Sequence, residues 1–273
     1  PHSYDREEPE ASIRLQELLE HGDQYDALVM TEGVPILMSM KREHSAYYAQ
    51  RFYCAMVTAN PDASVYLYET WSHLQAGDPD ADYGPREQWD WVPRLEDDRN
   101  QWSHIADVAM TGRVGEPRLR RRLAALFGGT EPGCTPRGPI FLVPVARVMV
   151  ELAHALEASP MPGPEGPLAM TDLFLNPYID WPADWPLDYA LSRSEREEIL
   201  AGLTLRRPGE EPDDIHPSDL GVWLTSLVHY ATLYRETPVG LPGPAGLPAE
   251  TVTAIQELVW RVVLADPRTG VAG

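Results

Sequence analysis

A carboxylate and an imidazole stand three residues apart in the segment Asp213-Asp214-Ile215-His216-Pro217. The helical pattern that begins at Ser218 follows directly, so the pair lies just before a predicted helix. This spacing allows the carboxylate to bond to the imidazole, to fix its tautomer and to leave the other ring nitrogen available for acid–base chemistry. The spacing selects Asp213 rather than Asp214 as the partner of His216. A purely structural ion pair between the same groups is the alternative interpretation.

The elements that would position this pair are predicted from the apolar pattern. Three runs have the length and composition of buried strands, namely Tyr25–Met30, Ser64–Tyr68 and Ile140–Val143. Apolar residues at helical spacing predict helices near residues 13–21, 48–59, 145–156, 220–231 and 249–264. This alternation favours an α/β fold with a mostly parallel sheet, in a three-layer α/β/α arrangement with right-handed crossovers.

Polar residues follow the first two predicted strands. Thr31-Glu32-Gly33 follows the first strand, and Glu69-Thr70-Trp71-Ser72-His73 follows the second. In open parallel sheets, ligands bind beyond the carboxyl ends of the strands. We therefore expect His216 to bond to Asp213 and to face a cleft near Glu32 or Glu69, provided that the helix after Ser218 packs on the sheet.

The chain resembles the SGNH/GDSL esterase family over about residues 13–241, most specifically in Asp213-Asp214-Ile215-His216-Pro217 and the amphipathic helix after it. Thr31-Glu32-Gly33-Val34-Pro35 and Tyr68-Glu69-Thr70-Trp71 are similar to a bacterial SGNH-like branch. The resemblance implies a flavodoxin-like fold of SGNH-hydrolase type. It also implies that Asp213 orients His216 and that His216 is the general base for a serine nucleophile.

The chain departs from the family pattern at the nucleophile. No Gly-Asp-Ser-like block is present, and the residues before Tyr25 leave no room for the strand that would carry it. Ser3 imitates a Gly-His-Ser turn without a strand before it. Ser72 follows a strand end beside His73, where a plain turn residue is the favoured interpretation. Neither serine is the expected nucleophile, although both are kept as candidates.

The family's oxyanion asparagine is also replaced. Thr31-Glu32-Gly33 occupies its place, and a glutamate would repel a developing oxyanion. Thr31 or the backbone N–H of Gly33 would have to donate instead, with Glu32, Glu69 and Trp71 as further candidates for substrate contact.

These features favour an ester hydrolase of SGNH type, or a fragment of one, that cleaves an acyl or acetyl ester of a small molecule or carbohydrate and needs no cofactor. A first alternative is a catalytically inactive SGNH-like module that binds carbohydrate or protein through its tryptophan-containing loops. A second alternative is a metal-assisted hydrolase with Glu32, Glu69, Asp213 and His216 as oxygen and nitrogen ligands. A Gly-Asp/His-Ser block encoded before Pro1 would favour the enzyme.

The formal net charge of −20 argues against nucleic acid and anionic membranes as partners, because phosphate binding needs clustered lysine and arginine. The one basic run, residues 118–122, is interpreted as a solvated helix face. No apolar run reaches transmembrane length. The compartment stays open, and would be the periplasm or the exterior if a signal peptide precedes Pro1.

Two cysteines form neither a disulfide scaffold nor a zinc site. Cys54 is interpreted as a core thiol, and its pairing with Cys134 is left open.

We expect one domain over residues 1–273 that lacks its first strand or strands, with long loop insertions at 77–102 and 176–212. The tryptophans of these loops would either pin them to the body or form a lid or substrate wall. Without its neighbour, the Tyr25–Met30 strand would be a sheet edge that is prone to self-association. Segments near Val114 or within Val252–Val263 are the alternatives for covering it.

Overall fold

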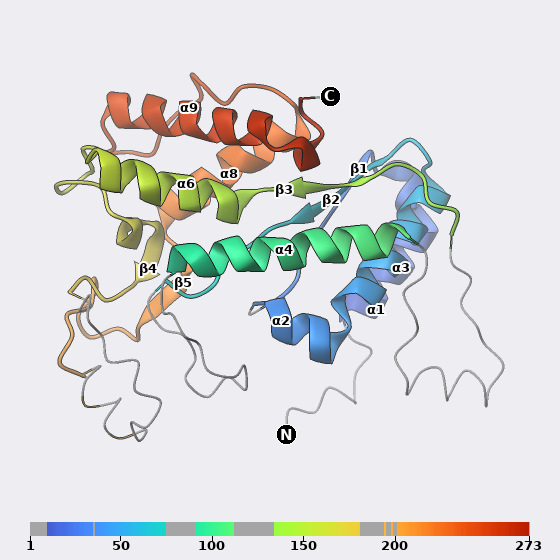
Figure 1. The fold of residues 1–273 in the computed structure, drawn as a ribbon, viewed down its shortest axis with the longest axis horizontal. Coiled ribbons are helices and arrows are strands. Elements are labelled where there is room, and N and C mark those ends of the chain that lie inside the picture. The colour runs from blue at the N-terminus through green and yellow to red at the C-terminus, as the bar shows by residue number, and fades with distance from the viewer. Residues whose placement is uncertain are drawn as a thin grey trace. The chain divides into compact units, whose positions relative to one another are not determined.

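The computed structural model describes residues 10–34, 36–74, 91–111, 134–180, 194, 198 and 201–272. It is a mixed α/β protein (Figure 1). The chain divides into two compact units, and the single domain expected from the sequence stays a prediction. Unit 1 comprises Pro1–Glu69 and Asn100–Val143, and unit 2 comprises Thr70–Arg99 and Pro144–Gly273.

Unit 1 contains a three-stranded parallel sheet in the order β1-β2-β3 (Figure 1). Its strands are β1 (Ala27–Met30), β2 (Ser64–Tyr68) and β3 (Ile140–Val143). The parallel pairing confirms the prediction, and β2 and β3 have the predicted bounds. The first strand begins two residues later than predicted, at Ala27 instead of Tyr25.

The predicted burial of the first strand is wrong. Ala27 and Val29 are exposed, Val29 to 41%, whereas Leu28 and Met30 pack against the core of unit 1. Successive side chains of a strand point to opposite faces, so only one face of β1 is covered. A continuous apolar run therefore does not by itself show that both faces of a strand are buried.

The helices of unit 1 cover the apolar residues of this sheet. They are α1 (Glu10–His21), the 3-10 turn η1 (Gly22–Gln24), the short α2 (Ile36–Met38) with the π turn η2 (Ser39–Glu43), and α3 (Ser45–Ala59). The helices α1 and α3 agree with the predicted ones. Their buried side chains join those of β2, β3 and the later half of α4 in one core.

The predicted loop at 77–102 is wrong from Trp91 onward, because α4 spans Trp91–Met110. The buried residues of this segment recur at helical spacing, but its acidic and aromatic composition hid that pattern. Trp91, Leu95, Trp102 and Ile105 are all buried. A proline in the first turn of a helix costs no backbone hydrogen bond, so Pro93 is compatible with this start. Residues 77–90 lie outside the described part of the chain, and so do Val114 and the basic run 118–122.

Unit 2 is built from helices and a small antiparallel sheet. Its elements are α6 (Val145–Ala158), η3 (Met170–Leu173), β4 (Phe174–Asn176), β5 (Asp213–Pro217), α8 (Asp219–Leu233), α9 (Ala249–Ala265) and η4 (Pro267–Thr269). The helix α9 packs against α6 and α8 (Figure 1). It holds Val252–Val263, so these residues form a helix and do not pair with β1 as a strand.

The segment with the candidate pair is a strand, β5, rather than a loop. It pairs with β4, where Phe174 is opposite Pro217 and Asn176 is opposite Asp213. Within the expected loop 176–212, the described residues include the last residue of β4 and an isolated bridge between Tyr178 and Leu205. Trp181 and Trp185 lie outside the described residues.

The start of α8 is fixed by a cap and a close packing contact. The Ser218 side chain accepts a hydrogen bond from the backbone N–H of Gly221 at 3.3 Å, as an N-cap residue does. A Cβ atom on Gly221 would lie 2.2 Å from the carbonyl oxygen of Leu173. A glycine is therefore required where α8 passes η3.

Within the described ranges, no helix is both long and apolar enough to cross a membrane.

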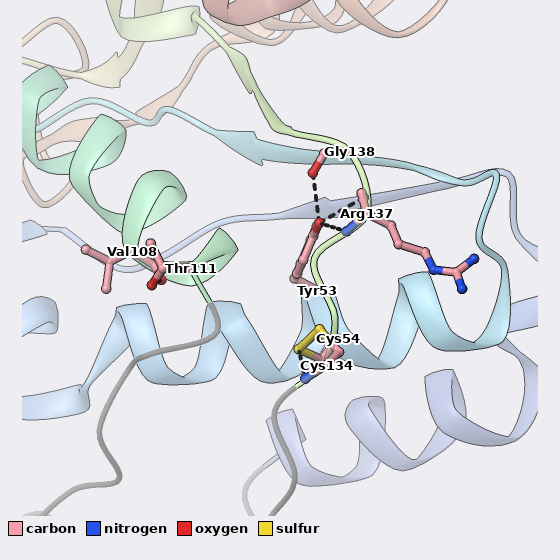
Figure 2. The surroundings of a disulfide bond; sticks show 7 residues. All are labelled: Tyr53, Cys54, Val108, Thr111, Cys134, Arg137 and Gly138. Atoms are coloured by element: carbon pink, nitrogen blue, oxygen red, sulfur yellow. Dashed lines mark hydrogen bonds between the residues drawn. A yellow bond between two sulfur atoms is a disulfide. The ribbon is translucent and has the colours of Figure 1, made fainter.

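A disulfide joins Cys54 of α3 to Cys134, 80 residues later, so the interpretation of Cys54 as a free core thiol is wrong. Tyr53 supports the same connection (Figure 2). Its hydroxyl accepts from the backbone N–H of Arg137 and lies 2.8 Å from the carbonyl oxygens of Arg137 and Gly138. Burial raises the pKa of the Tyr53 phenol, and the bond from Arg137 opposes that rise. The helix α3 is thus tied to the segment that leads into β3.

Candidate functional site

The strand β5 is held in unit 2 by the segment that begins at Thr70. The indole N–H of Trp71 donates to the carbonyl of Ile215 at 2.8 Å, and the backbone N–H of Leu74 donates to the carbonyl of Asp214 at 3.1 Å. Trp71 is buried and contacts Phe174 of β4 edge to face. Its indole therefore fixes the backbone of β5, and the contact of Trp71 with a substrate stays a prediction.

Asp213 and His216 form the predicted pair. The Nδ1 atom of His216 lies 3.1 Å from Oδ1 and 3.0 Å from Oδ2 of Asp213. The same carboxylate accepts the backbone N–H of His216 at 3.0 Å, so it is oriented by the local backbone. An ionised carboxylate can only accept hydrogen bonds, so Nδ1 must carry the hydrogen and the neutral ring has its lone pair on Nε2.

The imidazole of His216 is accessible. Its side chain is 72% exposed, whereas that of Asp213 is 28% exposed. This excludes the alternative in which His216 is a buried core histidine. The arrangement can take up a proton at Nε2 while the carboxylate stabilises the imidazolium that forms.

A second carboxylate–imidazole pair lies beside the first, and sequence reasoning missed it. The Nδ1 atom of His73 lies 2.7 Å from Oδ1 of Asp214, and their side chains are 39% and 11% exposed. Asp213 and Asp214 are successive residues of a strand, so their side chains leave β5 on opposite faces. His73 and Asp214 are 141 positions apart in the sequence, so no local sequence pattern connects them. The only signal was the position of His73 after the predicted second strand.

Asp214 also acts on a phenol. Tyr178 is buried, and its pKa is raised first by that burial and then by the negative charge of Asp214. The carboxylate of Asp214 therefore has an imidazole and a neutral phenol as neighbours in unit 2.

Ser72 does not pair with either histidine. Its side chain is buried, and its hydroxyl donates to Oδ2 of Asp98 at 2.8 Å. Its carbonyl accepts the indole N–H of Trp91 at 2.9 Å. A nucleophilic serine must lie within hydrogen-bond reach of its base. The structure therefore favours the turn-residue interpretation of Ser72. The other candidate, Ser3, lies outside the described residues.

The candidate oxyanion donors of unit 1 are engaged locally. The hydroxyl of Thr31 donates to the carbonyl of Tyr68 at 3.2 Å, and the backbone N–H of Gly33 donates to the carboxylate of Glu32 at 2.9 Å. Glu69 is fully buried, and its backbone N–H donates to Val143 at 3.1 Å. These residues belong to unit 1 and the histidine pairs to unit 2, so a cleft between His216 and Glu32 or Glu69 stays a prediction.

Metal coordination gains no support from the geometry. Within the described part of the chain, no group of three or more histidine, cysteine, aspartate or glutamate side chains is placed to hold a metal ion.

Comparison with known proteins gave no match to a family model, a curated protein or a solved structure. The likeness to SGNH/GDSL esterases therefore depends on the sequence segments quoted above.

Proposed function

We propose that the protein is an ester hydrolase of SGNH type in which Asp213 orients His216 and Nε2 of His216 is the general base. The observation that carries the proposal is the contact of both Asp213 carboxylate oxygens with Nδ1 at 3.0 and 3.1 Å beside an imidazole that is 72% exposed. The proposal includes the three-layer, flavodoxin-like arrangement of that family as the way in which the two units are joined.

The chemistry follows from the two ring nitrogens. Nε2 removes a proton from an attacking oxygen as that oxygen bonds to the ester carbonyl carbon. The bond from carbon to the leaving oxygen then breaks, and the proton on Nε2 passes to the leaving alkoxide. General-base assistance of this kind contributes roughly 10²- to 10⁴-fold to a rate.

In this proposal the chain keeps the Asp–His pair of the resembled family, and water takes the place of that family's serine as the attacking oxygen. His73 and His216 both have carboxylate partners, and no serine of the described residues is paired with either ring. Hydrolysis should therefore proceed without an acyl-serine intermediate, and serine-esterase activity should be little or none. Small acyl esters, including acetyl groups on carbohydrate, are the substrate class.

A catalytically inactive binding module is the second candidate. The observation that favours it is that Ser72 and the Gly33 N–H are already engaged with Asp98 and Glu32. The described tryptophans at 71, 91 and 102 are buried, so they do not supply the contact surface that this candidate was expected to use.

Ester hydrolysis by variants of His216 distinguishes these candidates. The substrate is p-nitrophenyl acetate, with initial rates for the unmodified chain, His216→Gln and Asp213→Asn. Exposed imidazoles hydrolyse this ester without any site, so His154→Gln is the matched control. His154 is also exposed and lies 3.8 Å from the carboxylate of Glu157 three residues away.

The proposal predicts that His216→Gln lowers the rate about 10²-fold or more, within the range of general-base assistance, and that Asp213→Asn lowers it less. His154→Gln should remove only the small background rate of one exposed imidazole. Equal rates for His216→Gln and the unmodified chain would support the binding module. Labelling of one serine by an organophosphate, with loss of activity, would show that the water mechanism is wrong.

A further inference from the structure

Three arginines line one cavity in unit 2, although the chain carries a formal charge of −20. The cavity has a volume of about 470 Å³, within the usual range for sites that bind small molecules. The first half of α4, the helix α6 and the end of α9 form it. Its lining residues are Arg99, Arg147, Glu151, Arg261, Val262, Ala265, Asp266 and Pro267.

Two of the arginines are partly neutralised by ion pairs. The NH2 group of Arg99 lies 2.6 Å from Oδ2 of Asp266, and NH2 of Arg147 lies 2.6 Å from Oε1 of Glu151. Arg147 also lies 3.7 Å from Glu96 through NH1. The carboxylate of Asp266 is almost completely buried and also accepts the backbone N–H of Arg268 at 3.0 Å. These pairs hold Arg99 and Arg147 in place at the cavity.

After these ion pairs are formed, guanidinium N–H groups remain that have no acceptor. The NH1 atom of Arg99 is buried and has no hydrogen-bond partner. Arg261 lines the cavity and makes no ion pair with any of the described residues. Against Arg99, Arg147 and Arg261, the lining supplies only the carboxylates of Glu151 and Asp266. Among the lining residues, Arg261 is therefore the guanidinium without an ion-pair partner in the described part of the chain, whereas Arg147 also lies near Glu96 outside the lining.

We propose that this cavity binds the phosphate group of a small phosphorylated molecule. A phosphate monoester carries about −1.5 to −2 charges and three acceptor oxygens, and guanidinium groups match its geometry. Its oxygens can accept from the exposed guanidinium of Arg261, with Arg99 and Arg147 lining the same cavity, whereas a single carboxylate has less charge and fewer oxygens. The apolar side chains of Val262, Ala265 and Pro267 provide a wall for the rest of the molecule.

Calorimetric titration with inorganic phosphate, phenyl phosphate and acetate at low ionic strength tests the site. The variants are Arg261→Gln, which removes an exposed side chain, and Arg99→Lys, which keeps a charge beside Asp266 but removes a guanidinium group from the lining. Arg207→Gln is the matched control, because Arg207 is an exposed arginine of unit 2 that lies 3.8 Å from Glu210, outside the cavity lining. Circular dichroism of each variant checks that it is folded.

The proposal predicts saturable binding of one phosphate per chain and weaker binding of acetate. Loss of a charge-assisted hydrogen bond should raise Kd about tenfold in Arg261→Gln and in Arg99→Lys. Arg207→Gln should bind as the unmodified chain does. The proposal is wrong if neither phosphate binds saturably, if acetate binds as tightly, or if Arg261→Gln has no effect. Phosphate binding does not depend on His216, so this result is independent of the hydrolase proposal.

Discussion

Asp213 and Asp214 are neighbours in the sequence, yet each orients a different imidazole. Asp213 bonds to His216 on its own strand, and Asp214 bonds to His73 from the segment that precedes α4. Successive side chains of a strand point to opposite faces, so the side chains of Asp213 and Asp214 lie on opposite faces of β5. The two carboxylates of one short strand thereby orient two imidazoles, and the more exposed one, His216, is better placed to meet a substrate.

Ser72→Ala should lower stability without lowering the rate of ester hydrolysis by the folded chain. The change removes a buried hydroxyl that donates to Asp98, which should cost about 1–3 kcal/mol in the free energy of unfolding. Urea denaturation measures that loss, and p-nitrophenyl acetate measures the rate. A loss of activity at full stability would make Ser72 the nucleophile after all.

Tyr178 should make stability depend on alkaline pH. Its raised pKa means that the folded chain favours the neutral phenol, so this contribution is complete below the unfolded value near 10 and is lost as the pH rises through the higher folded value. Tyr178→Phe should therefore flatten the fall in stability above pH 10. Denaturation midpoints from about pH 8 to 11 measure it, and an unchanged slope would contradict the assignment.

Residue-level prediction succeeded where the geometry is local. The Asp213–His216 contact is set by a three-residue spacing and by backbone N–H groups of the same segment. His73 and Asp214 meet only because the chain after β2 runs beside β5, which no spacing encodes. The same applies to the disulfide, whose cysteines are 80 residues apart.

At the scale of elements, α3 and the segment before β3 behave as one connected piece. The disulfide joins them covalently, and the hydroxyl of Tyr53 bonds to the backbone at Arg137 (Figure 2). The polar contacts of Tyr53 thus reinforce the covalent link next to it.

Removing the disulfide should destabilise unit 1. Cys54→Ser combined with Cys134→Ser releases a loop of 80 residues in the unfolded chain, and the loss of a native disulfide typically costs about 2–5 kcal/mol. Urea denaturation of the oxidised chain, the reduced chain and the double variant measures the effect. The reduced chain and the double variant should agree. Equal stability of all three would show that the link contributes nothing.

Elements with strong local patterns were predictable, and two others were not. The strands β2 and β3 and the helices α3, α6 and α9 follow from apolar runs and helical spacing. The strand β5 contains two aspartates and a histidine and is a strand because it pairs with β4. The start of α4 was hidden by its acidic and aromatic composition, although its buried residues have helical spacing.

At the scale of the whole molecule, the edge of the unit 1 sheet is the main liability. Among the described strands, β1 pairs only with β2. The carbonyl of Asp26 accepts from Ser64, so the even-numbered residues of β1 face β2 and the odd-numbered residues face away. Val29, whose side chain is exposed, is one of the residues whose backbone N–H and C=O groups face away from β2. Such an edge can pair with a second copy of the chain.

Hydrogen exchange over residues 26–31 tests this edge. In a dilute monomer, the amides of Leu28 and Met30 should be protected and those of Ala27 and Val29 should exchange rapidly. Protection of Ala27 and Val29 that grows with concentration would show self-association through the strand, and Val29→Lys should reduce it. Strong protection of all four amides in a dilute monomer would show that another segment covers the edge.

The central claim is that Asp213 holds His216 with its proton on Nδ1 and leaves Nε2 as the base. Two-dimensional ¹⁵N–¹H NMR of the imidazole nitrogens reports the tautomer of the neutral ring directly. The account predicts the Nδ1–H form for His216 in the unmodified chain and a shift toward the Nε2–H form in Asp213→Asn, with His154 unchanged as the reference. A neutral His216 that carries its proton on Nε2 in the unmodified chain would contradict the account.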